Sequence, residues 1–286
     1  MLTSVSDIRQ IAVCGAGTMG AGIAQVSAAA GFPTLLFDVR PEAVAAGIVM
    51  IRKNLDKAVE KGKISPEDRE ATLQRLQPCH QVSDCKAGLV IEAIVEKIPV
   101  KTALFSELAQ YNPATTIFAT NTSSLSVTAI AAGIPHPERV GGMHFFNPAH
   151  LMTLVEVVSG AQTAESVTQL LYAVVQHMGK TPVHVKDAPG FIVNRVARHY
   201  YLEAMEIAAS GVADPAVIDR LLESAGFRMG AFALMDLIGN DVNYAVTRSL
   251  YEAFDQAPRF RPGAMQAALV EKGDLGRKTG KGFYKY

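Results

Sequence analysis

Short apolar runs alternate with longer stretches of helical spacing through the first two thirds of the chain. The runs are rich in β-branched residues, which is typical of strands, and the stretches between them follow the helical period. The predicted strands span residues 11–14, 34–38, 89–94, 116–120, 140–145, 154–158 and 182–185. The predicted helices between them span residues 18–30, 41–61, 66–76, 99–111 and 164–178. This alternation predicts an α/β fold with a mostly parallel sheet.

Strand patterns stop after residue 185, and the rest of the chain has helical patterns. The helices are predicted at residues 191–209, 215–225, 231–254 and 262–272. The sequence Lys-Asp-Ala-Pro-Gly at residues 186–190 is rich in turn formers and marks the change of pattern. We therefore predict a sheet domain of residues 1–186 followed by an all-helical C-terminal domain of residues 187–286.

Composition argues against several classes of partner. Lys and Arg number 27, as do Asp and Glu, so no net field draws the protein to nucleic acid or to an anionic membrane. Residues 10–37 carry no charge, but glycines and a proline interrupt them, which argues against a signal peptide or a membrane span. The three cysteines lack the spacing of a disulfide framework or a zinc site, so we expect a cytoplasmic location and no metal.

The first predicted strand runs into the sequence Cys-Gly-Ala-Gly-Thr-Met-Gly, which places GxGxxG at the start of a predicted helix. In this pattern Gly15 allows the tight turn, Gly17 lets the backbone approach a pyrophosphate, and Gly20 lets helix and strand pack closely. The first helical turn, with Thr18 and Met19, offers backbone N–H groups to phosphates. The pattern predicts a Rossmann-type dinucleotide site; the alternative is a glycine-rich turn without a ligand.

Asp38 ends the second predicted strand, where a carboxylate accepts hydrogen bonds from the adenosine ribose of a dinucleotide. A 2′-phosphate at this place would be repelled, so Asp38 favours NAD over NADP. Arg40 weakens this preference, because its guanidinium can reach such a phosphate. We predict NAD as the cofactor.

Polar residues also mark the ends of later strands. Glu96, Ser123, His144 and Asn147 each lie at or just beyond the end of a predicted strand. Ligands of open parallel sheets bind beyond the carboxyl ends of the strands, so these residues together predict one cleft. Taken singly, each is also explained by turn or helix-cap chemistry.

Glu156 interrupts the apolar run Leu-Val-Glu-Val-Val, where an unpaired carboxylate would be costly to bury. His144 is the available hydrogen-bonding or cationic partner. The alternative is that Glu156 faces solvent from an edge strand and that His144 is a core histidine. The residue types alone leave both interpretations open.

Several separate motifs occur in the order found in one enzyme family. They are the glycine motif at 15–20, Glu-Ala-Ile-Val-Glu at 92–96, Asn-Thr-Ser-Ser at 121–124, His-Phe-Phe-Asn-Pro at 144–148 leading to Leu-Val-Glu at 154–156, Pro-Gly-Phe-Ile-Val-Asn-Arg at 189–195, and Leu-Gly-Arg-Lys-Thr-Gly at 275–280 before Gly-Phe-Tyr at 282–284. With these motifs the whole chain resembles the short-chain L-3-hydroxyacyl-CoA dehydrogenases, of the 3-hydroxybutyryl-CoA dehydrogenase type. The resemblance implies reversible, NAD-dependent oxidation of an L-3-hydroxyacyl-CoA to the 3-oxoacyl-CoA.

The resemblance also implies roles for individual residues. His144 would be the general base that takes the proton of the 3-hydroxyl group, a task that suits an imidazole near neutral pH. Glu156 would orient the imidazole and stabilise its protonated form. Ser123 and Asn194 would donate hydrogen bonds to the substrate around its hydroxyl and thioester oxygens.

The binding residues are implied in the same way. Those matched to NAD contacts are Gly15, Gly17, Thr18, Met19, Gly20, Asp38, Glu96, Lys101, Ser123, Asn147 and Lys278. Those matched to CoA contacts are Asn54, Lys61 and Ser123. Lys53, Lys57 and Lys61 share one helix face that can meet phosphates, although Asp56 and Glu60 make an ordinary solvated face the alternative.

The acyl group and two rival functions stay open. The sequence Asp-Leu-Ile-Gly-Asn-Asp-Val-Asn at 236–243 resembles enzymes that act on 3-hydroxyadipyl-CoA, whose distal carboxylate Arg228, Arg259 or Arg261 could meet. His150 departs from the usual family pattern and is expected to be a loop residue. The rivals are a dehydrogenase of free hydroxy or sugar acids and a catalytically silent NAD-binding protein. As in relatives, we expect acyl-CoA between the domains and a homodimer formed by the helical domain.

Overall fold

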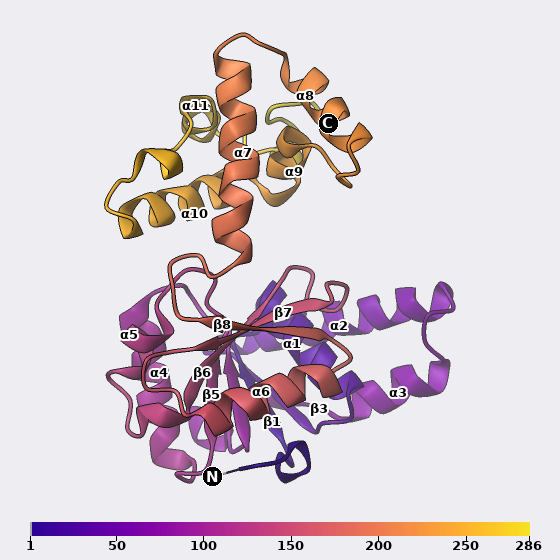
Figure 1. Ribbon diagram of the computed structural model, residues 1–286. Helices are drawn as coiled ribbons and strands as arrows, with labels where there is room; N and C mark the ends of the chain where they lie inside the picture. Colours follow the sequence, from indigo (N-terminus) through magenta and orange to yellow (C-terminus); the bar gives the residue numbers. More distant parts are fainter. Residues whose placement is uncertain (1) are drawn as a thin grey trace. The chain divides into compact units, whose positions relative to one another are not determined.

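The computed structural model describes residues 2–286, which form two compact units, one ending at Ala188 and the other beginning at Pro189 (Figure 1). The first unit is built on an eight-stranded sheet with the order β3-β2-β1-β4-β5-β6-β7-β8. Its strands are β1 (Ile11–Cys14), β2 (Thr34–Phe37), β3 (Leu76–Cys79), β4 (Leu89–Glu92), β5 (Ile117–Thr120), β6 (Val140–Phe145), β7 (Leu154–Ser159) and β8 (Thr181–Lys186).

The six strands β3, β2, β1, β4, β5 and β6, in their order in the sheet, are all parallel. Strand β7 runs antiparallel to β6, and β8 is parallel to β7. The predicted α/β fold with a mostly parallel sheet is therefore confirmed. Because the order reverses between β1 and β4, the carboxyl ends of these two strands open the crevice in which such sheets bind ligands.

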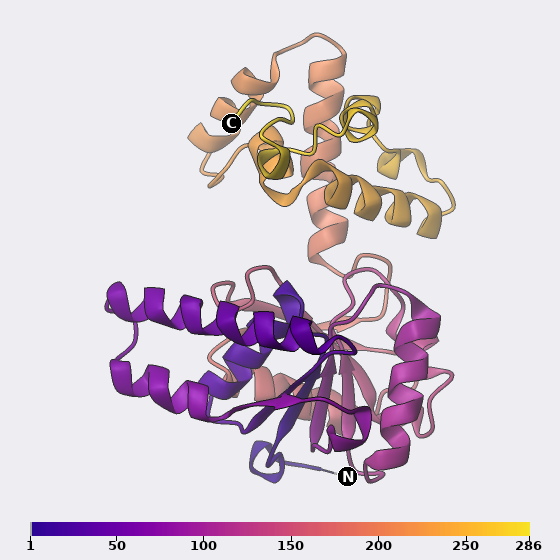
Figure 2. The ribbon, with the colours of Figure 1, turned by 180° about the vertical axis from the view of Figure 1, so that it is seen from behind.

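Helices cover both faces of this sheet, as its residue pattern requires. They are α1 (Thr18–Ala29), α2 (Pro41–Glu60), α3 (Pro66–Gln74), α4 (Ile98–Tyr111), α5 (Val127–Ala131) and α6 (Glu165–His177). In β1, Ile11 and Val13 belong to one buried apolar cluster, and Ala12 and Cys14 belong to the cluster on the opposite face. Successive residues of a strand point to opposite faces, so a fully apolar strand serves two cores. Helices α2 and α3 extend past the sheet as a pair (Figure 2).

The second unit is helical. It contains α7 (Val193–Ala209), α8 (Pro215–Ser224), α9 (Ala231–Ile238), α10 (Asn240–Ala253) and α11 (Ala264–Lys272). Its core includes Tyr201 and Met205 of the long helix α7, which meet Ile218, Phe232 and Met235 of the following helices. Single 3₁₀ turns complete the two units at η1 (Val5–Asp7), η2 (Val82–Asp84), η3 (Pro137–Arg139), η4 (Pro258–Phe260) and η5 (Arg277–Thr279).

Three elements differ from the sequence predictions. Strand β3 was assigned in part to a helix that we predicted to run to residue 76, because this half-exposed edge strand contains a proline and little apolar pattern. Helix α5 is only one turn long and was not predicted. The helix predicted at 231–254 is two helices, because Gly239 adopts a φ of 101°, outside the helical region.

Within residues 2–286, none of the helices has the length and apolar character needed to cross a bilayer. The charge-free segment 10–37 instead folds into β1, α1 and β2. The three cysteines are free thiols and all are buried. The Sγ atoms of Cys79 and Cys85 lie 3.4 Å apart, which their sequence spacing did not indicate.

Asp236 of α9 is a structural carboxylate of the helical unit. It is buried, and it accepts hydrogen bonds from the backbone N–H groups of Phe283 and Tyr284, from Asn240 Nδ2 and from Tyr286 Oη. These bonds tie the C-terminal segment to α9. The sequence at 236–243, which we interpreted through its resemblance to 3-hydroxyadipyl-CoA enzymes, thus begins with a residue that holds the fold.

Asp236→Asn should therefore destabilise the helical unit. The new amide N–H₂ cannot accept the hydrogen bonds that one carboxylate oxygen accepted, so it faces N–H and O–H donors, and we expect a loss of about 3 kcal/mol in the free energy of unfolding. Urea denaturation measures the change. Asp214→Asn, at an exposed position of the same unit, is the matched control and should change stability by less than about 0.5 kcal/mol. Equal midpoints for the two variants would contradict the assignment.

Candidate active site

The glycine loop between β1 and α1 has the backbone geometry that its pattern requires. Gly15 adopts a φ of 103°, and a Cβ atom there would lie 2.5 Å from Ala93 O. A Cβ atom on Gly20 would overlap the carbonyl oxygen of Gly15, whereas one on Gly17 would meet no atom within 4 Å. Gly15 and Gly20 are thus needed for internal packing, and Gly17 faces open space through which a ligand can approach the backbone.

The space beside this loop suits an adenosine and its phosphates. No side chain caps α1, whose N-cap residue is Gly17, so no side chain competes with a phosphate for the N-terminal N–H groups. A cavity of about 410 Å³ next to the loop is lined by Ala16, Gly17, Thr18, Arg40, Glu42, Ala43, Ala46, Gly47 and Met50. Asp38 lies at the edge of the loop, where its Oδ2 accepts a hydrogen bond from Ala16 N at 2.9 Å. The residues present therefore fit a dinucleotide.

Arg40 lies beside Asp38 without forming a close ion pair. Its Nε is 3.8 Å from Asp38 Oδ1, and its side chain is 70% exposed. Asp38 Oδ1 instead accepts a hydrogen bond from the backbone N–H of Arg40 at 3.0 Å. The carboxylate is fixed by two backbone donors, whereas the guanidinium stays in solvent at the mouth of the cavity.

His144 and Glu156 face each other across β6 and β7. The antiparallel register pairs them directly, so their side chains lie on the same face of the sheet. His144 Nδ1 is 2.7 Å from Glu156 Oε2, and both side chains are buried. Because β8 covers the other side of β7, Glu156 is not on an edge strand, and the solvent-facing alternative is excluded. Since a carboxylate only accepts, we place the proton on Nδ1, which leaves Nε2 as the basic nitrogen.

The loops after β4, β5 and β6 are joined by hydrogen bonds. Glu96 Oε1 accepts hydrogen bonds from Thr122 Oγ1 and from Ser123 N, the latter at 2.8 Å. Asn121 Oδ1 accepts one from Phe145 N at 2.9 Å. The carboxyl ends of β4, β5 and β6 are therefore held together, with Glu96, Ser123 and His144 near them. Asn147 is exposed on the loop beyond β6.

Lys101 differs from its sequence interpretation as a cofactor contact, because it is almost fully buried. Its Nζ donates to Glu92 Oε1 at 2.6 Å and lies 3.1 Å from Glu96 Oε2. Burial raises the pKa of Glu92 against the opposing effect of Lys101. Burial also acts to raise the pKa of Glu96, but Lys101 and Thr122 outweigh it and the pKa is lowered. Sequence reasoning missed the role of Glu92, although a glutamate that ends an apolar strand needs a partner for the same reason as Glu156 does.

Two of the residues matched to CoA, Asn54 and Lys61, lie on α2 and at its end, whereas Ser123 follows β5. Lys53, Lys57 and Lys61 are exposed. Asp56, which argued for an ordinary solvated face, is engaged by Arg69 Nε of α3 at 2.6 Å. Asn54 Nδ2 donates to Gln25 Oε1 of α1 at 3.2 Å. With Asp56 neutralised by α3, the three lysines leave this face more positive than the sequence suggested.

Two predicted site residues belong to the helical unit. Asn194 lies in the first turn of α7. Lys278 forms an ion pair with Asp241 of α10, with Nζ 2.6 Å from Oδ1, which the sequence did not indicate. Among the three arginines considered for a distal carboxylate, Arg259 stacks on the rings of Phe254 and Phe260 within its own unit.

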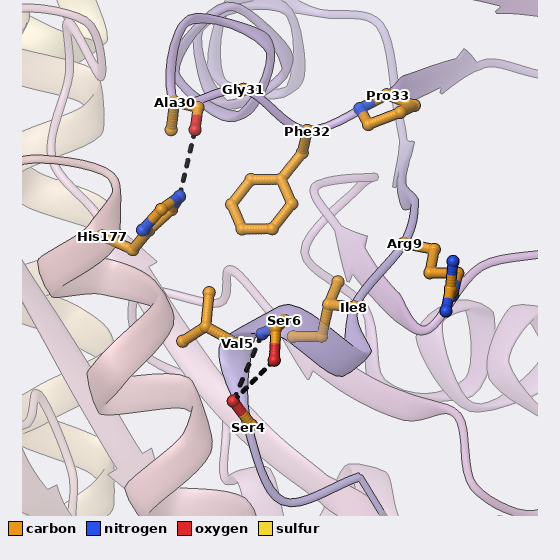
Figure 3. Close-up of a pocket in the computed structure, with 10 residues that line it drawn as sticks. All are labelled: Ser4, Val5, Ser6, Ile8, Arg9, Ala30, Gly31, Phe32, Pro33 and His177. Carbon is orange, nitrogen blue, oxygen red and sulfur yellow. Dashed lines mark hydrogen bonds between the residues drawn. The ribbon is translucent and has the colours of Figure 1, made fainter.

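A second cavity, of about 720 Å³, contains none of the predicted site residues (Figure 3). Its lining comes from η1, from the segment before β2 and from the end of α6, so it lies at the amino ends of the parallel strands. The ring of Phe32 projects into it, and the imidazole of His177 already bonds Ala30 O at 3.1 Å. Ligands of such sheets bind beyond the carboxyl ends of the strands, so this cavity is not our candidate site.

Comparisons with known proteins place both units. Residues 10–188 match a family model described as 3-hydroxyacyl-CoA dehydrogenase, NAD binding domain, and residues 190–286 match its C-terminal domain. The first match confirms NAD as the predicted cofactor. The chain is 50% identical to 3-hydroxyadipyl-CoA dehydrogenase of Escherichia coli strain K12 over 98% of its own length, but it spans only 59% of that relative. It is 41% identical to a probable 3-hydroxybutyryl-CoA dehydrogenase of Bacillus subtilis, with 98% of each chain covered.

Solved structures agree with these relatives. A crystal structure of 3-hydroxybutyryl-CoA dehydrogenase from Escherichia coli matches with a TM-score of 0.95 and 50% identity, over 97% of this chain and 59% of that one. A crystal structure of (S)-3-hydroxybutyryl-CoA dehydrogenase from Ralstonia eutropha matches with a TM-score of 0.94 and 37% identity, over 98% and 99% of the two chains.

Proposed function

The chain belongs to the 3-hydroxyacyl-CoA dehydrogenase family, and from this premise we propose that it oxidises an L-3-hydroxyacyl-CoA to the 3-oxoacyl-CoA with NAD. The observation that carries the proposal is the buried contact of 2.7 Å between His144 Nδ1 on β6 and Glu156 Oε2 on β7. A buried imidazole fixed by a carboxylate is an arrangement for moving a proton. The resemblance of the flanking motifs supports the same reaction.

In this mechanism Nε2 of His144 takes the proton of the 3-hydroxyl group. Bound NAD would supply the acceptor for the hydride from C3. Glu156 keeps the imidazole in the tautomer with a basic Nε2, and its negative charge stabilises the imidazolium that forms. Ser123 orients the substrate by hydrogen bonding, as we also propose for Asn194. Running the steps backward, the imidazolium returns its proton to the 3-oxo oxygen.

We also propose specific residues for binding NAD. Glycines 15, 17 and 20, with Thr18 and Met19, would hold the pyrophosphate, and Asp38 would accept hydrogen bonds from the adenosine ribose. Glu96, Ser123, Asn147 and Lys278 remain proposed contacts from the family resemblance. For Lys101 we propose an indirect role instead, because its ammonium is engaged by two carboxylates.

Asp38→Ala tests the selection of NAD. Two unit charges about 4 Å apart near a protein surface repel by about 4 kcal/mol. If solvent screening leaves about half of this energy, removing the carboxylate should raise the ratio of NADPH to NADH affinity about 30-fold. Fluorescence titration with each reduced cofactor measures this ratio. Arg40→Ala, at the neighbouring exposed side chain, is the control and should lower NADPH binding only. An unchanged ratio in Asp38→Ala would mean that this carboxylate does not select the cofactor.

The names of the relatives and the exposed lysines of α2 and its end support one substrate class. We propose a CoA thioester, whose phosphates would meet Lys53, Lys57 and Lys61 and whose CoA moiety would contact Asn54. Among acyl groups, 3-hydroxybutyryl and 3-hydroxyadipyl are the two candidates. Initial rates of NADH formation on the C4, C6, C8 and 3-hydroxyadipyl thioesters would rank them. Turnover of free hydroxy acids without turnover of any thioester would instead support the rival function.

We further propose that the first unit is the NAD-binding domain, that the helical unit is a substrate and dimerisation domain, and that the enzyme works as a cytoplasmic homodimer. Val196, Val212, Leu221 and Phe227 expose large apolar side chains on the helical unit, which suits an interface. Three unpaired thiols suit a reducing compartment. Sedimentation of a monomer at micromolar concentration would reject the dimer.

A further inference from the structure

A buried ion pair lies beneath the loops that follow β4 and β5. Glu92, the last residue of β4, is 0% exposed, and Lys101 of α4 is 1% exposed. Their contact of 2.6 Å joins two charges that water would otherwise solvate. Burying such a pair costs desolvation energy that its mutual attraction repays only with good geometry and further hydrogen bonds. An apolar pair of similar volume would fill the same space at a lower cost, so the charges need another explanation.

The remaining contacts of Glu92 complete its hydrogen bonding. Its Oε1 also accepts a bond from Ile94 N at 2.7 Å, and its Oε2 accepts one from Thr120 Oγ1 at 2.8 Å. The ammonium, the backbone amide and the hydroxyl can all donate to an ionised carboxylate. Glu92 is thereby fixed to the loop after its own strand, to the end of β5 and to α4.

The ammonium of Lys101 connects Glu92 to Glu96, which lies in the loop after β4. Its Nζ lies 3.1 Å from Glu96 Oε2, and the other oxygen of Glu96 accepts bonds from Thr122 Oγ1 and from Ser123 N. The orientation of the Glu96 carboxylate therefore depends on Lys101 on one side and holds the Ser123 backbone on the other. Because Glu92 shares the ammonium, Lys101 is not free to turn fully toward Glu96.

We propose that Glu92 is a positioning residue for hydride transfer. It holds Lys101 in place, Lys101 orients Glu96, and Glu96 fixes the backbone of Ser123 against the reacting groups. This inference rests on the proposed function for its kinetic consequence, but not for its structural one. Without the carboxylate of Glu92, Lys101 turns toward Glu96, its other carboxylate partner among residues 2–286, and the Glu96 carboxylate follows it away from Ser123 N.

The test compares Glu92→Gln with Glu107→Gln, which makes the same change at an exposed position of α4. Hydrogen exchange of the Ser123 amide, measured without cofactor or substrate, should be about tenfold faster in Glu92→Gln and unchanged in Glu107→Gln. The kcat should fall about 30-fold in Glu92→Gln, with KM for the thioester within about threefold, because orientation rather than binding is lost. Unchanged exchange at Ser123 would overturn the proposal.

A double variant separates positioning from simple structural support. Glu92→Gln with Lys101→Met removes both buried charges and should recover the thermal stability that Glu92→Gln loses. If Glu92 is a positioning residue, neither the slow exchange at Ser123 nor kcat recovers with stability. Recovery of all three together would show that the pair is only structural. If the wild type turned over no thioester, the proposed function would fall, while the exchange data would still decide the role of Glu92.

Discussion

Replacing His144 with glutamine is expected to lower kcat for the preferred L-3-hydroxyacyl-CoA about 10³-fold. A general base contributes roughly 10²- to 10⁴-fold to such a reaction, and His144 Nδ1 lies 2.7 Å from the Glu156 carboxylate that would stabilise its protonated form. Glutamine has a similar volume, and its amide can still donate to Glu156, so the buried carboxylate keeps a partner. Stopped-flow measurement of NADH formation reports the chemical step directly.

Two controls accompany this variant. His150→Gln makes the same change in the loop after Pro148, where burial lowers the pKa of a half-buried imidazole that our mechanism does not use. It should keep kcat within about threefold of the wild type. NADH affinity of His144→Gln should also stay near the wild-type value, because the proposed dinucleotide site lies at β1, β2 and the glycine loop. A His144→Gln enzyme with more than about a tenth of wild-type kcat would rule out His144 as the base.

Replacing Glu156 with glutamine should lower kcat about 10²-fold, which corresponds to about 2.7 kcal/mol in the barrier. The neutral amide can still accept a bond from Nδ1–H, but it no longer stabilises the imidazolium by charge. Because the carboxylate acts only through the imidazole, His144→Gln/Glu156→Gln should be no more than about threefold slower than His144→Gln alone.

The double-mutant cycle is the sharper part of this prediction. Independent contributions would multiply, and the double variant would then lose about 10⁵-fold. A multiplicative loss would show that Glu156 acts on the substrate by another route than through His144. Thermal denaturation of all three variants checks that lost activity does not come from lost folding, since breaking a buried pair can cost about 3–5 kcal/mol.

The sequence predicted the architecture because its signals are local. Each buried strand of the parallel sheet is an apolar run, and each helix that covers it has its own period, so the α/β alternation could be followed without knowing which strands are neighbours. The glycine motif specified its own loop, since Gly15 and Gly20 leave no room for a Cβ atom. The cost of burying a lone carboxylate indicated that Glu156 needs a partner, and the family motifs pointed to His144 as that partner.

The sequence was insufficient where an element has a weak apolar pattern, or where the partner of a charged residue lies far away along the chain. Strand β3 has little apolar pattern because it lies at the sheet edge, and the two helices separated by Gly239 have one uninterrupted helical pattern in the sequence. The resemblance suggested that Lys101 contacts the cofactor, yet its ammonium lies between two carboxylates. The sequence at 236–243 did not indicate that Asp236 binds the C-terminal segment.

The sequence by itself therefore determined the class of fold and the glycine loop, because each depends on residue type and local spacing, and the family motifs singled out His144 and Glu156. Only the tertiary structure decided that β7 runs antiparallel to β6, which sets His144 opposite Glu156 in register. It also decided that Glu92, Lys101 and Glu96 share one buried network. Both depend on the neighbours that a strand acquires on folding, and a buried charge shows in the sequence only that it needs a partner, not which partner the fold supplies.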